Sequence, residues 1–136
     1  MTEKWIYVGI FPDSISKAKN LSALEKYNIT VPNDWKRFNH HMTLAFNNGT
    51  DEAKSIYDYY KKYVGIKTNL TVDGIGVSDD AIALRIKFTN PIANKIPHIT
   101  MATPKMGKPV NSNKITEWRD IDEFEINGIL KTYSKK

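Results

Sequence analysis

Apolar residues near the start of the chain predict a strand followed by a helix. Residues 5–11 are mostly β-branched or aromatic and stop at Pro12, which is typical of a strand buried on both faces. Asp13 or Ser14 can cap a helix of about three turns behind this strand. The apolar residues at helical spacing within that helix are Ile15, Ala18, Leu21 and Leu24. We expect these four side chains to pack against the core.

A second strand and helix follow a connection, residues 29–39, that shows no clear period. Residues 40–46 predict a strand, closed by the turn sequence Asn-Asn-Gly at residues 47–49. Thr50 can cap the helix behind this turn, and two acidic residues in its first turn suit the helix dipole. Apolar side chains then recur every three or four residues until Gly65, which can end the helix.

The second half of the chain predicts strands with no helix between them. Residues 68–77 and 81–88 predict a hairpin, since apolar and polar residues alternate in its second strand. Residues 98–103 predict another strand, residues 104–113 a loop rich in Gly, Pro and Asn, and residues 124–133 the last strand. The order of two strand–helix pairs and then four strands indicates an α+β fold with antiparallel pairing.

Length and composition are those of a single globular domain, residues 1–136. The absence of cysteine excludes disulfides and thiol nucleophiles. No stretch resembles a signal peptide or a membrane span, so we expect a cytoplasmic protein with no membrane contact. The formal net charge of +5 favours an anionic partner, although scattered lysines are also typical of ordinary surface solvation.

The most specific pattern in the chain is a repeated His-x-Thr sequence. His41 and Thr43 form one copy, and His98 and Thr100 form the other. Residues i and i+2 of a strand point to the same face, so each copy would present an imidazole beside a hydroxyl. The surrounding sequences, His-Met-Thr-Leu-Ala and His-Ile-Thr-Met-Ala, match in residue class at every position. Two such pairs facing each other would form a phosphate site.

These side chains fit the cleavage of a phosphodiester beside a ribose hydroxyl. Histidine, with a pKa of about 6.5, can act as base for the attacking oxygen or as acid for the departing one. The threonine hydroxyls can donate hydrogen bonds to the phosphate oxygens. The scheme needs no cofactor, and the sequence shows no cluster of metal ligands. Each motif alone also fits a packed histidine beside a β-forming threonine, and it is the pairing that favours catalysis. His40, next to His41, is expected on the opposite face in a structural role.

The two motifs and the strand–helix order before them resemble the 2H phosphoesterase superfamily, which is named for two His-x-Thr/Ser motifs. This resemblance implies a bilobal fold in which two antiparallel sheets flank a central groove, with helices outside. It implies metal-independent phosphodiester cleavage in which His41, Thr43, His98 and Thr100 are the catalytic residues, with acid and base unassigned. The expected partner is a nucleotide or oligoribonucleotide substrate, and with no protein partner evident the chain is expected to be a monomer.

Two branches of the superfamily are similar to parts of this chain. Residues 98–113 and 128–133 resemble the cyclic phosphodiesterase part of tRNA ligases and the myelin-type cyclic nucleotide phosphodiesterases. The small size resembles viral and phage members, which act in the host cytoplasm on cyclic or 2′,5′-linked oligonucleotide immune signals. The substrate is therefore open between a 2′,3′-cyclic phosphate and 2′,5′-linked or cyclic oligonucleotides. The alternatives are RNA end processing in repair, a general RNA nuclease and a non-catalytic RNA- or nucleotide-binding domain.

Further residues are candidates for substrate binding. Tyr7 and Phe11 lie on one face of the first strand and could stack a base, or belong to the core. Lys108 and Ser112 follow the second motif and could reach a phosphate, or be solvated loop residues. Trp118 could cover the groove or only pack against it.

Overall fold

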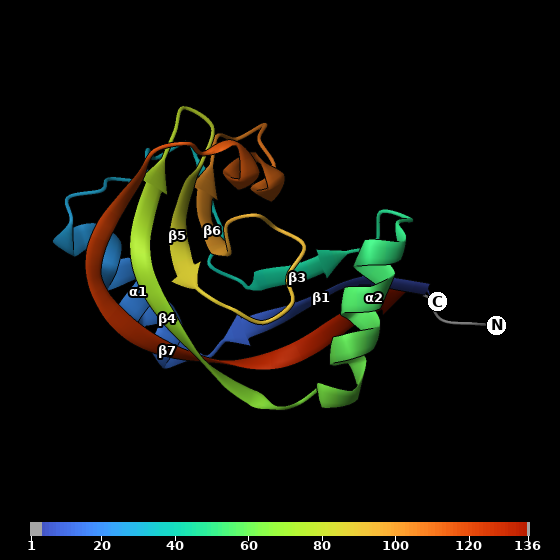
Figure 1. Cartoon of the computed structure of the whole chain (residues 1–136). Helices are drawn as coiled ribbons and strands as arrows, with labels where there is room; N and C mark the ends of the chain where they lie inside the picture. The colour runs from blue at the N-terminus through green and yellow to red at the C-terminus, as the bar shows by residue number, and fades with distance from the viewer. Residues whose placement is uncertain (1–3, 136) are drawn as a thin grey trace.

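The computed structural model describes residues 4–135, which form seven strands in one antiparallel sheet (Figure 1). The strands are β1 (Lys4–Pro12), β2 (Lys36–Arg37), β3 (Met42–Phe46), β4 (Lys67–Val77), β5 (Ile82–Lys87), β6 (His98–Thr103) and β7 (Trp118–Lys135). The helical segments are α1 (Ser14–Lys26), α2 (Asp51–Tyr60) and the short 3₁₀ turns η1 (Lys61–Tyr63) and η2 (Pro109–Lys114). The α+β class predicted from the sequence is confirmed.

The sheet closes on itself, so the prediction of two separate flanking sheets is wrong. The strand order is β2-β6-β3-β1-β7-β4-β5, and β5 also pairs with β6, which closes six strands into a barrel. β7 is the reason: its first part pairs with β4 and its second part with β1, so one long strand runs through both halves. The twist of such long strands brings the ends of the sheet together. Met42 and Ile99 are the one residue pair between β3 and β6, which we call the β3–β6 bridge.

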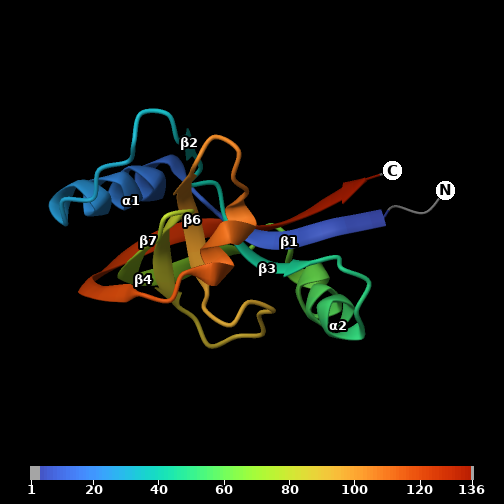
Figure 2. The same cartoon turned by 90° about the horizontal axis from the view of Figure 1, so that it is seen from above.

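The two helices cover different parts of the sheet. α1 packs on β7 and β1, whereas α2 packs on β3 and β1, and Figure 2 shows them at opposite ends of the molecule. The hydroxyl of Thr50 caps α2 by accepting a hydrogen bond from the amide of Ala53 at 3.2 Å, as predicted. Ala53, Ile56 and Tyr60 of α2 join the main hydrophobic core, to which Leu44 of β3 also belongs.

α1 buries a different face from the one that its apolar residues predict. Ile15, Ala18 and Leu21 are exposed. The buried residues are Ser16, Asn20, Ala23 and Leu24. The reason is a polar contact with the sheet, because the hydroxyl of Ser16 accepts a hydrogen bond from the amide of Asn127 at 2.7 Å. Buried polar groups are tolerated when they are hydrogen-bonded, and hydropathy patterns do not reveal such faces.

Three segments differ from their predicted structure for related reasons. β7 begins at Trp118 instead of residue 124, since its mostly polar first part pairs with β4 and shows no alternation. β2 lies within the segment 29–39, and η2 begins within the segment 104–113 and ends one residue beyond it; both segments are predicted as irregular, and both elements are too short to produce a period. None of the helices within residues 4–135 has the length and apolar character needed to cross a membrane.

The segment that enters β3 carries an insertion opposite β6. The chain pairs with β6 up to Asn39, whose amide donates to the carbonyl of Thr100 at 2.9 Å. The next pair is the β3–β6 bridge, so residues 40–41 are inserted opposite a single step of β6. The insertion therefore acts like a β-bulge, which re-aims the side chains that follow it.

Asn39 fixes this insertion in place. Its φ of 80° lies in the left-handed region, which asparagine tolerates better than most residues. Its buried side chain donates to the carbonyl of Lys17 at 3.0 Å and accepts from the amide of Asn20 at 2.9 Å. α1 thus holds the residues immediately before His41, and no pattern in the sequence singles out Asn39 for this role.

Asn39→Ala is expected to lower the free energy of unfolding by about 2–4 kcal/mol, because it leaves the buried amide of Asn20 unpaired and strains the backbone. Asn39→Gly loses the same hydrogen bonds but tolerates the left-handed φ, so its loss should be smaller by about 1 kcal/mol. Urea unfolding followed by circular dichroism measures both values. Equal losses in the two variants would show that the left-handed backbone contributes nothing.

Candidate functional site

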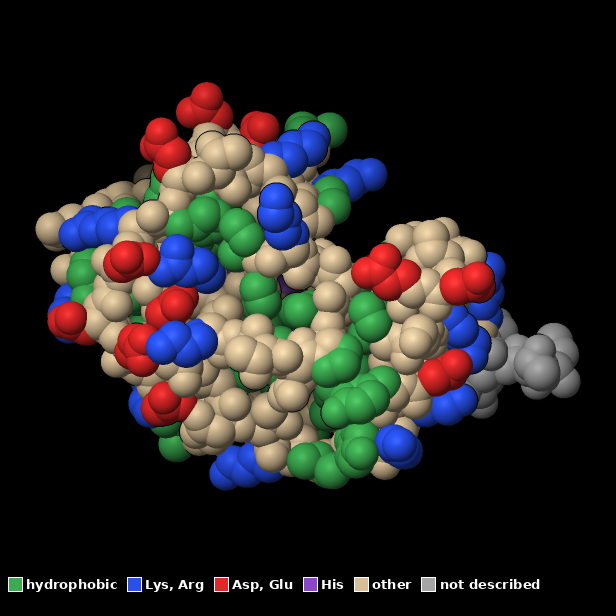
Figure 3. Space-filling model, in the orientation of Figure 1, with side chains coloured by type: hydrophobic (Ala, Val, Ile, Leu, Met, Phe, Trp, Pro, Cys, Tyr) green, Lys and Arg blue, Asp and Glu red, His purple; other side chains and the backbone are tan. Residues whose placement is uncertain are grey.

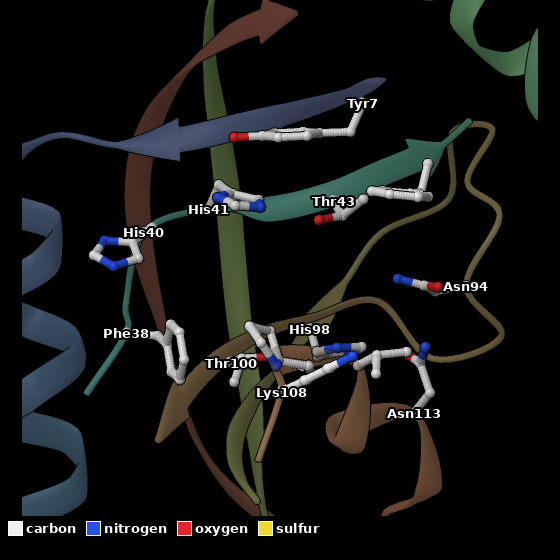
Figure 4. Close-up of a pocket in the computed structure, with 13 residues that line it drawn as sticks. Tyr7, Phe38, His40, His41, Thr43, Asn94, His98, Thr100, Lys108 and Asn113 are labelled. Carbon is white, nitrogen blue, oxygen red and sulfur yellow. Dashed lines mark hydrogen bonds between the residues drawn. The ribbon is translucent and has the colours of Figure 1, made fainter. Parts of the chain in front are cut away.

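A groove of about 520 Å³ opens beside the β3–β6 bridge, a volume typical of small-molecule sites. Figure 3 shows a hollow in the surface with part of a histidine visible inside, and Figure 4 shows the side chains around the groove. The groove is lined by Tyr7, Phe38, His40, His41, Thr43, Phe46, Asn94, His98, Thr100, Lys108, Pro109, Val110 and Asn113.

Both His-x-Thr pairs lie in this groove. His98 and Thr100 alternate along β6, so they share a face, as predicted. Thr43 lies on β3, and His41 lies on the insertion just before that strand. Antiparallel pairing at the β3–β6 bridge places Thr43 toward His98, whereas His41 lies on the insertion, outside the ladder. Figure 4 shows the two pairs facing each other across the groove.

The imidazole of His98 is held in one tautomer by the backbone. Its Nδ1 lies 2.8 Å from the carbonyl oxygen of Ile96, which can only accept, so Nδ1 carries the hydrogen. In the neutral ring, Nε2 therefore keeps a free lone pair. Burial lowers the pKa of His98, and the hydrogen bond to Ile96 partly opposes this effect. His98 is thus arranged to accept a proton at Nε2.

The imidazole of His41 lies in an aromatic slot formed by β1. Its ring is stacked on Tyr7, with centroids 4.9 Å apart and planes at 15°, and its centroid is also 4.9 Å from that of Phe11. Gly9 lies between these two aromatic residues on the same face of β1. Burial lowers the pKa of His41 to about 4, with a smaller contribution from the neighbouring His40. Its Nδ1 is buried without a hydrogen-bond partner.

His41 should make the folded protein less stable as the pH falls below its ordinary pKa. That pKa is lowered from 6.5 to about 4, so between these values the unfolded chain binds the proton and the folded protein does not. The stabilisation is complete above 6.5 and is lost as the pH falls towards 4. Urea unfolding at neutral and acidic pH should show this loss, and His41→Gln should reduce it. An NMR titration midpoint of His41 near its ordinary pKa would contradict the buried neutral ring.

The hydroxyl of Thr100 is held by two neighbours from the loop after β6. It lies 2.8 Å from the hydroxyl of Ser112 and 3.2 Å from the carbonyl oxygen of Pro109, to which it donates. Ser112 is buried and does not line the groove, so the prediction that it contacts substrate directly is not supported by its position. Its position instead suits a residue that orients Thr100.

The remaining predicted binding residues have different locations. Lys108 and Tyr7 line the groove, although one face of the Tyr7 ring is covered by His41. Phe11 does not line it, because its ring packs beside His41 and under Lys131. Trp118 lies elsewhere and packs on a small cluster that includes Ile115, so its predicted place over the groove is wrong. The alternative of a packing role fits Phe11, whereas Trp118 neither covers this groove nor packs against it.

His40 does not lie on a face opposite the groove, contrary to the expected alternation. It is exposed and lines the groove, and its ring meets Phe38 edge-on at 5.9 Å. The strand begins only at Met42, after the insertion, so the period of two does not extend back to His40.

Phe46 lines the groove for a related reason, and sequence reasoning missed it. In a regular strand Phe46 would face away from Thr43. Gly9 pairs with Thr43 and Val8 with Ala45, so the ladder between β1 and β3 has a one-residue bulge. Tyr7, which shares a face with Gly9, then pairs with Phe46 and brings it to the groove. Phe38, Asn94 and Asn113 were also missed, since they come from segments without a period.

The surface of the groove is mostly apolar, and its few polar side chains include no acidic group. Its lining contains imidazole, hydroxyl and amide groups and the ammonium of Lys108, and it includes neither Asp nor Glu. This composition favours an anionic ligand. Within residues 4–135, no group of three His, Cys, Asp or Glu side chains is placed to hold a metal ion.

Comparison with models of protein families finds no match for this sequence, and comparison with curated proteins finds none either. A function for this chain therefore rests on the groove and its chemistry. Two imidazoles with lowered pKa values, each beside a hydroxyl, can move protons on two sides of one bound group.

Proposed function

We propose that this chain is a metal-independent phosphodiesterase of the 2H type, acting on a ribonucleotide phosphodiester. The observation that carries the proposal is the presence of both His-x-Thr pairs in one groove without acidic side chains. Titratable groups that are perturbed by burial and share a cleft are typical of active sites. The resemblance of the two motifs to the superfamily supports the same reaction class.

His98 suits the role of general base. The hydrogen bond from its Nδ1 to Ile96 leaves Nε2 free to accept a proton. The attacking oxygen belongs to water when the substrate is a 2′,3′-cyclic phosphate, or to a ribose hydroxyl when it is an internal linkage. As this oxygen bonds to phosphorus, its proton passes to Nε2 of His98.

His41 suits the role of general acid on the other side of the phosphate. Its pKa is low in the free groove, but a bound phosphate anion favours the protonated imidazole and raises that pKa. The bond between phosphorus and the departing ribose oxygen breaks, and that oxygen takes the proton from His41. The hydroxyls of Thr43 and Thr100 donate to the non-bridging oxygens as their charge increases. In the free groove the Thr100 hydroxyl donates to the carbonyl of Pro109, so its single hydrogen must turn to the phosphate when substrate binds, while Ser112 donates to the Thr100 oxygen.

The test is cleavage of a substrate panel by the purified protein in EDTA. The panel holds a nucleoside 2′,3′-cyclic phosphate, an RNA ending in a cyclic phosphate, a 2′,5′-oligoadenylate, and cyclic di- and trinucleotides. We expect cleavage of at least one member, with loss of turnover in His41→Ala and in His98→Ala. Cleavage of the RNA end alone would favour RNA repair, whereas cleavage of cyclic or 2′,5′-linked oligonucleotides would favour removal of a nucleotide signal.

Other results of the same panel would contradict the proposal. Binding that persists in both histidine variants, with no cleavage by the wild type, would identify a non-catalytic nucleotide-binding domain. Internal degradation of a long unstructured RNA would identify a general nuclease. Activity that requires an added divalent metal would exclude the metal-independent scheme.

A further inference from the structure

The groove continues past the four motif side chains in both directions. Figure 4 shows Phe38 and His40 on one side of them, and Asn94 and Asn113 on the other. All four of these residues line the groove. A site for a phosphate with a single nucleoside needs an extension on one side only.

The side that holds Asn94 and Asn113 also holds Phe46. This residue ends β3, three residues past Thr43, and thus about 10 Å farther along the strand. The loop that carries Asn94 is fixed to the same strand, because the amide of Ala93 donates to the carbonyl of Leu44 at 2.8 Å. Phe46 is 57% exposed, so its ring is accessible to a ligand in the groove. We call this part of the groove the Phe46 end.

The opposite part, which we call the Phe38 end, is formed by residues just before the first motif. Phe38 is half-buried and lines the groove three residues before His41. Its amide donates to the carbonyl of Met101 at 2.8 Å, which ties the segment to β6. Each end of the groove therefore offers one phenylalanine ring on a backbone that is hydrogen-bonded to the barrel.

We propose that the groove binds two nucleosides, one on each side of the phosphate, and that its substrate is an internal linkage in a short oligonucleotide. The bases would stack on Phe38 and Phe46, since every base offers an aromatic face. The amides of Asn94 and Asn113 can both donate and accept, so they can bind the edge of the base at the Phe46 end. The inference rests on the proposed function for the position of the phosphate between the two ends.

Binding is measured with His98→Asn, which retains a side-chain donor for Ile96 but lacks Nε2, so that bound substrates stay intact. Titration calorimetry compares a 2′,5′-linked diadenylate with adenosine 2′,3′-cyclic phosphate. We expect the diadenylate to bind about tenfold more tightly or better, because a second stacked base contributes about 5- to 150-fold. The wild-type protein with a 2′,5′-linked diadenylate methylated on the 3′-hydroxyl beside the linkage, which lacks the attacking hydroxyl, gives a second value that does not depend on this variant.

Two further variants, made in the His98→Asn protein, test whether each end of the groove binds a base. Phe38→Ala and Phe46→Ala should each weaken diadenylate binding by about 5- to 150-fold, whereas only one of them should weaken binding of the mononucleotide. Tyr59→Ala is the matched control, since this tyrosine on α2 is 44% exposed and lies outside the groove. It should leave both dissociation constants unchanged.

The inference is overturned if the mononucleotide binds as tightly as the diadenylate, or if either phenylalanine variant leaves diadenylate binding within twofold of its parent. Failure of the proposed function looks different. Tight, Phe38- and Phe46-dependent binding of the diadenylate with no cleavage by the wild type would refute the enzyme and retain the two-nucleoside groove. Cleavage of only single-nucleoside cyclic phosphates would retain the enzyme and refute the groove assignment.

Discussion

Replacing His98 by asparagine is expected to lower kcat by about 10²- to 10⁴-fold on whichever substrate the panel identifies, which is the usual contribution of a positioned acid or base. The asparagine amide can occupy the place of Nδ1 and still donate to the carbonyl of Ile96, which His98 contacts at 2.8 Å. The variant therefore keeps the local hydrogen bond and removes only Nε2. Steady-state kinetics measure the loss, and circular dichroism with urea unfolding verifies the fold.

Variants of the other two histidines provide the comparison. His41→Gln should lose kcat to a similar extent, and the double variant should be little worse than either single one, because residues that act in one step are not additive. His40→Ala should lose less than about tenfold, since the proposed scheme assigns His40 no proton transfer. Full activity in His98→Asn would refute the assignment of His98 as base.

The pH dependence of kcat/KM is an independent test of the roles of His41 and His98. Turnover needs one neutral and one protonated imidazole, and burial lowers both pKa values below 6.5. The required form therefore becomes rarer as the pH rises above both pKa values, about tenfold for each pH unit. We expect a maximum on the acidic side of 6.5 and a decline through neutrality. A kcat/KM that stays constant from acidic to alkaline pH would contradict proton transfer by this pair of imidazoles.

The sequence predicts the motif-bearing strands well because their patterns are local. His98 and Thr100 share a face through the period of two, which the intact strand β6 preserves. Thr50 caps α2 through a contact three residues away, which a capping signal encodes directly. In each case the residues that decide the structure are neighbours in the chain.

The parts that the sequence did not predict depend on distant contacts. The polar face of α1 is buried because Ser16 and Asn20 meet Asn127 and Asn39, residues on other elements. Closure of the barrel depends on the length of β7, whose polar first part has no strand-like alternation. Such pairings are set by tertiary packing, which overrides local propensity.

Bulges limited the prediction of the site most of all. The insertion at residues 40–41 and the bulge between Thr43 and Ala45 each shift the alternation of side chains. They place His40 and Phe46 in the groove, where a regular strand would have turned them away. A motif can thus be found from sequence while the residues around it cannot.

Gly9→Ala is expected to lower kcat/KM by about 10²-fold, since a displacement of about 1 Å at a catalytic group has an effect of this size. A β-carbon at Gly9 would lie 2.9 Å from the carbonyl oxygen of Met42 and 3.4 Å from Cδ2 of His41. The nearer contact is with backbone, which cannot rotate away, so β3 must shift. The shift would move His41 out of its position against Tyr7 and Phe11. The overpacking should also lower the free energy of unfolding by about 1–3 kcal/mol.

Gly65→Ala is the control that separates the effect of lower stability from the effect of a displaced His41. Gly65 has a φ of 95° and no atom near the place of an added β-carbon, so alanine there adds backbone strain without a collision. Its stability should fall by about 1–2 kcal/mol, comparable to Gly9→Ala, while kcat/KM stays near that of the wild type. The ring protons of His41, shielded by Tyr7 in the stacked arrangement, should shift in NMR spectra of Gly9→Ala only. If both glycine variants lose activity in proportion to stability, Gly9 has no special role in positioning His41.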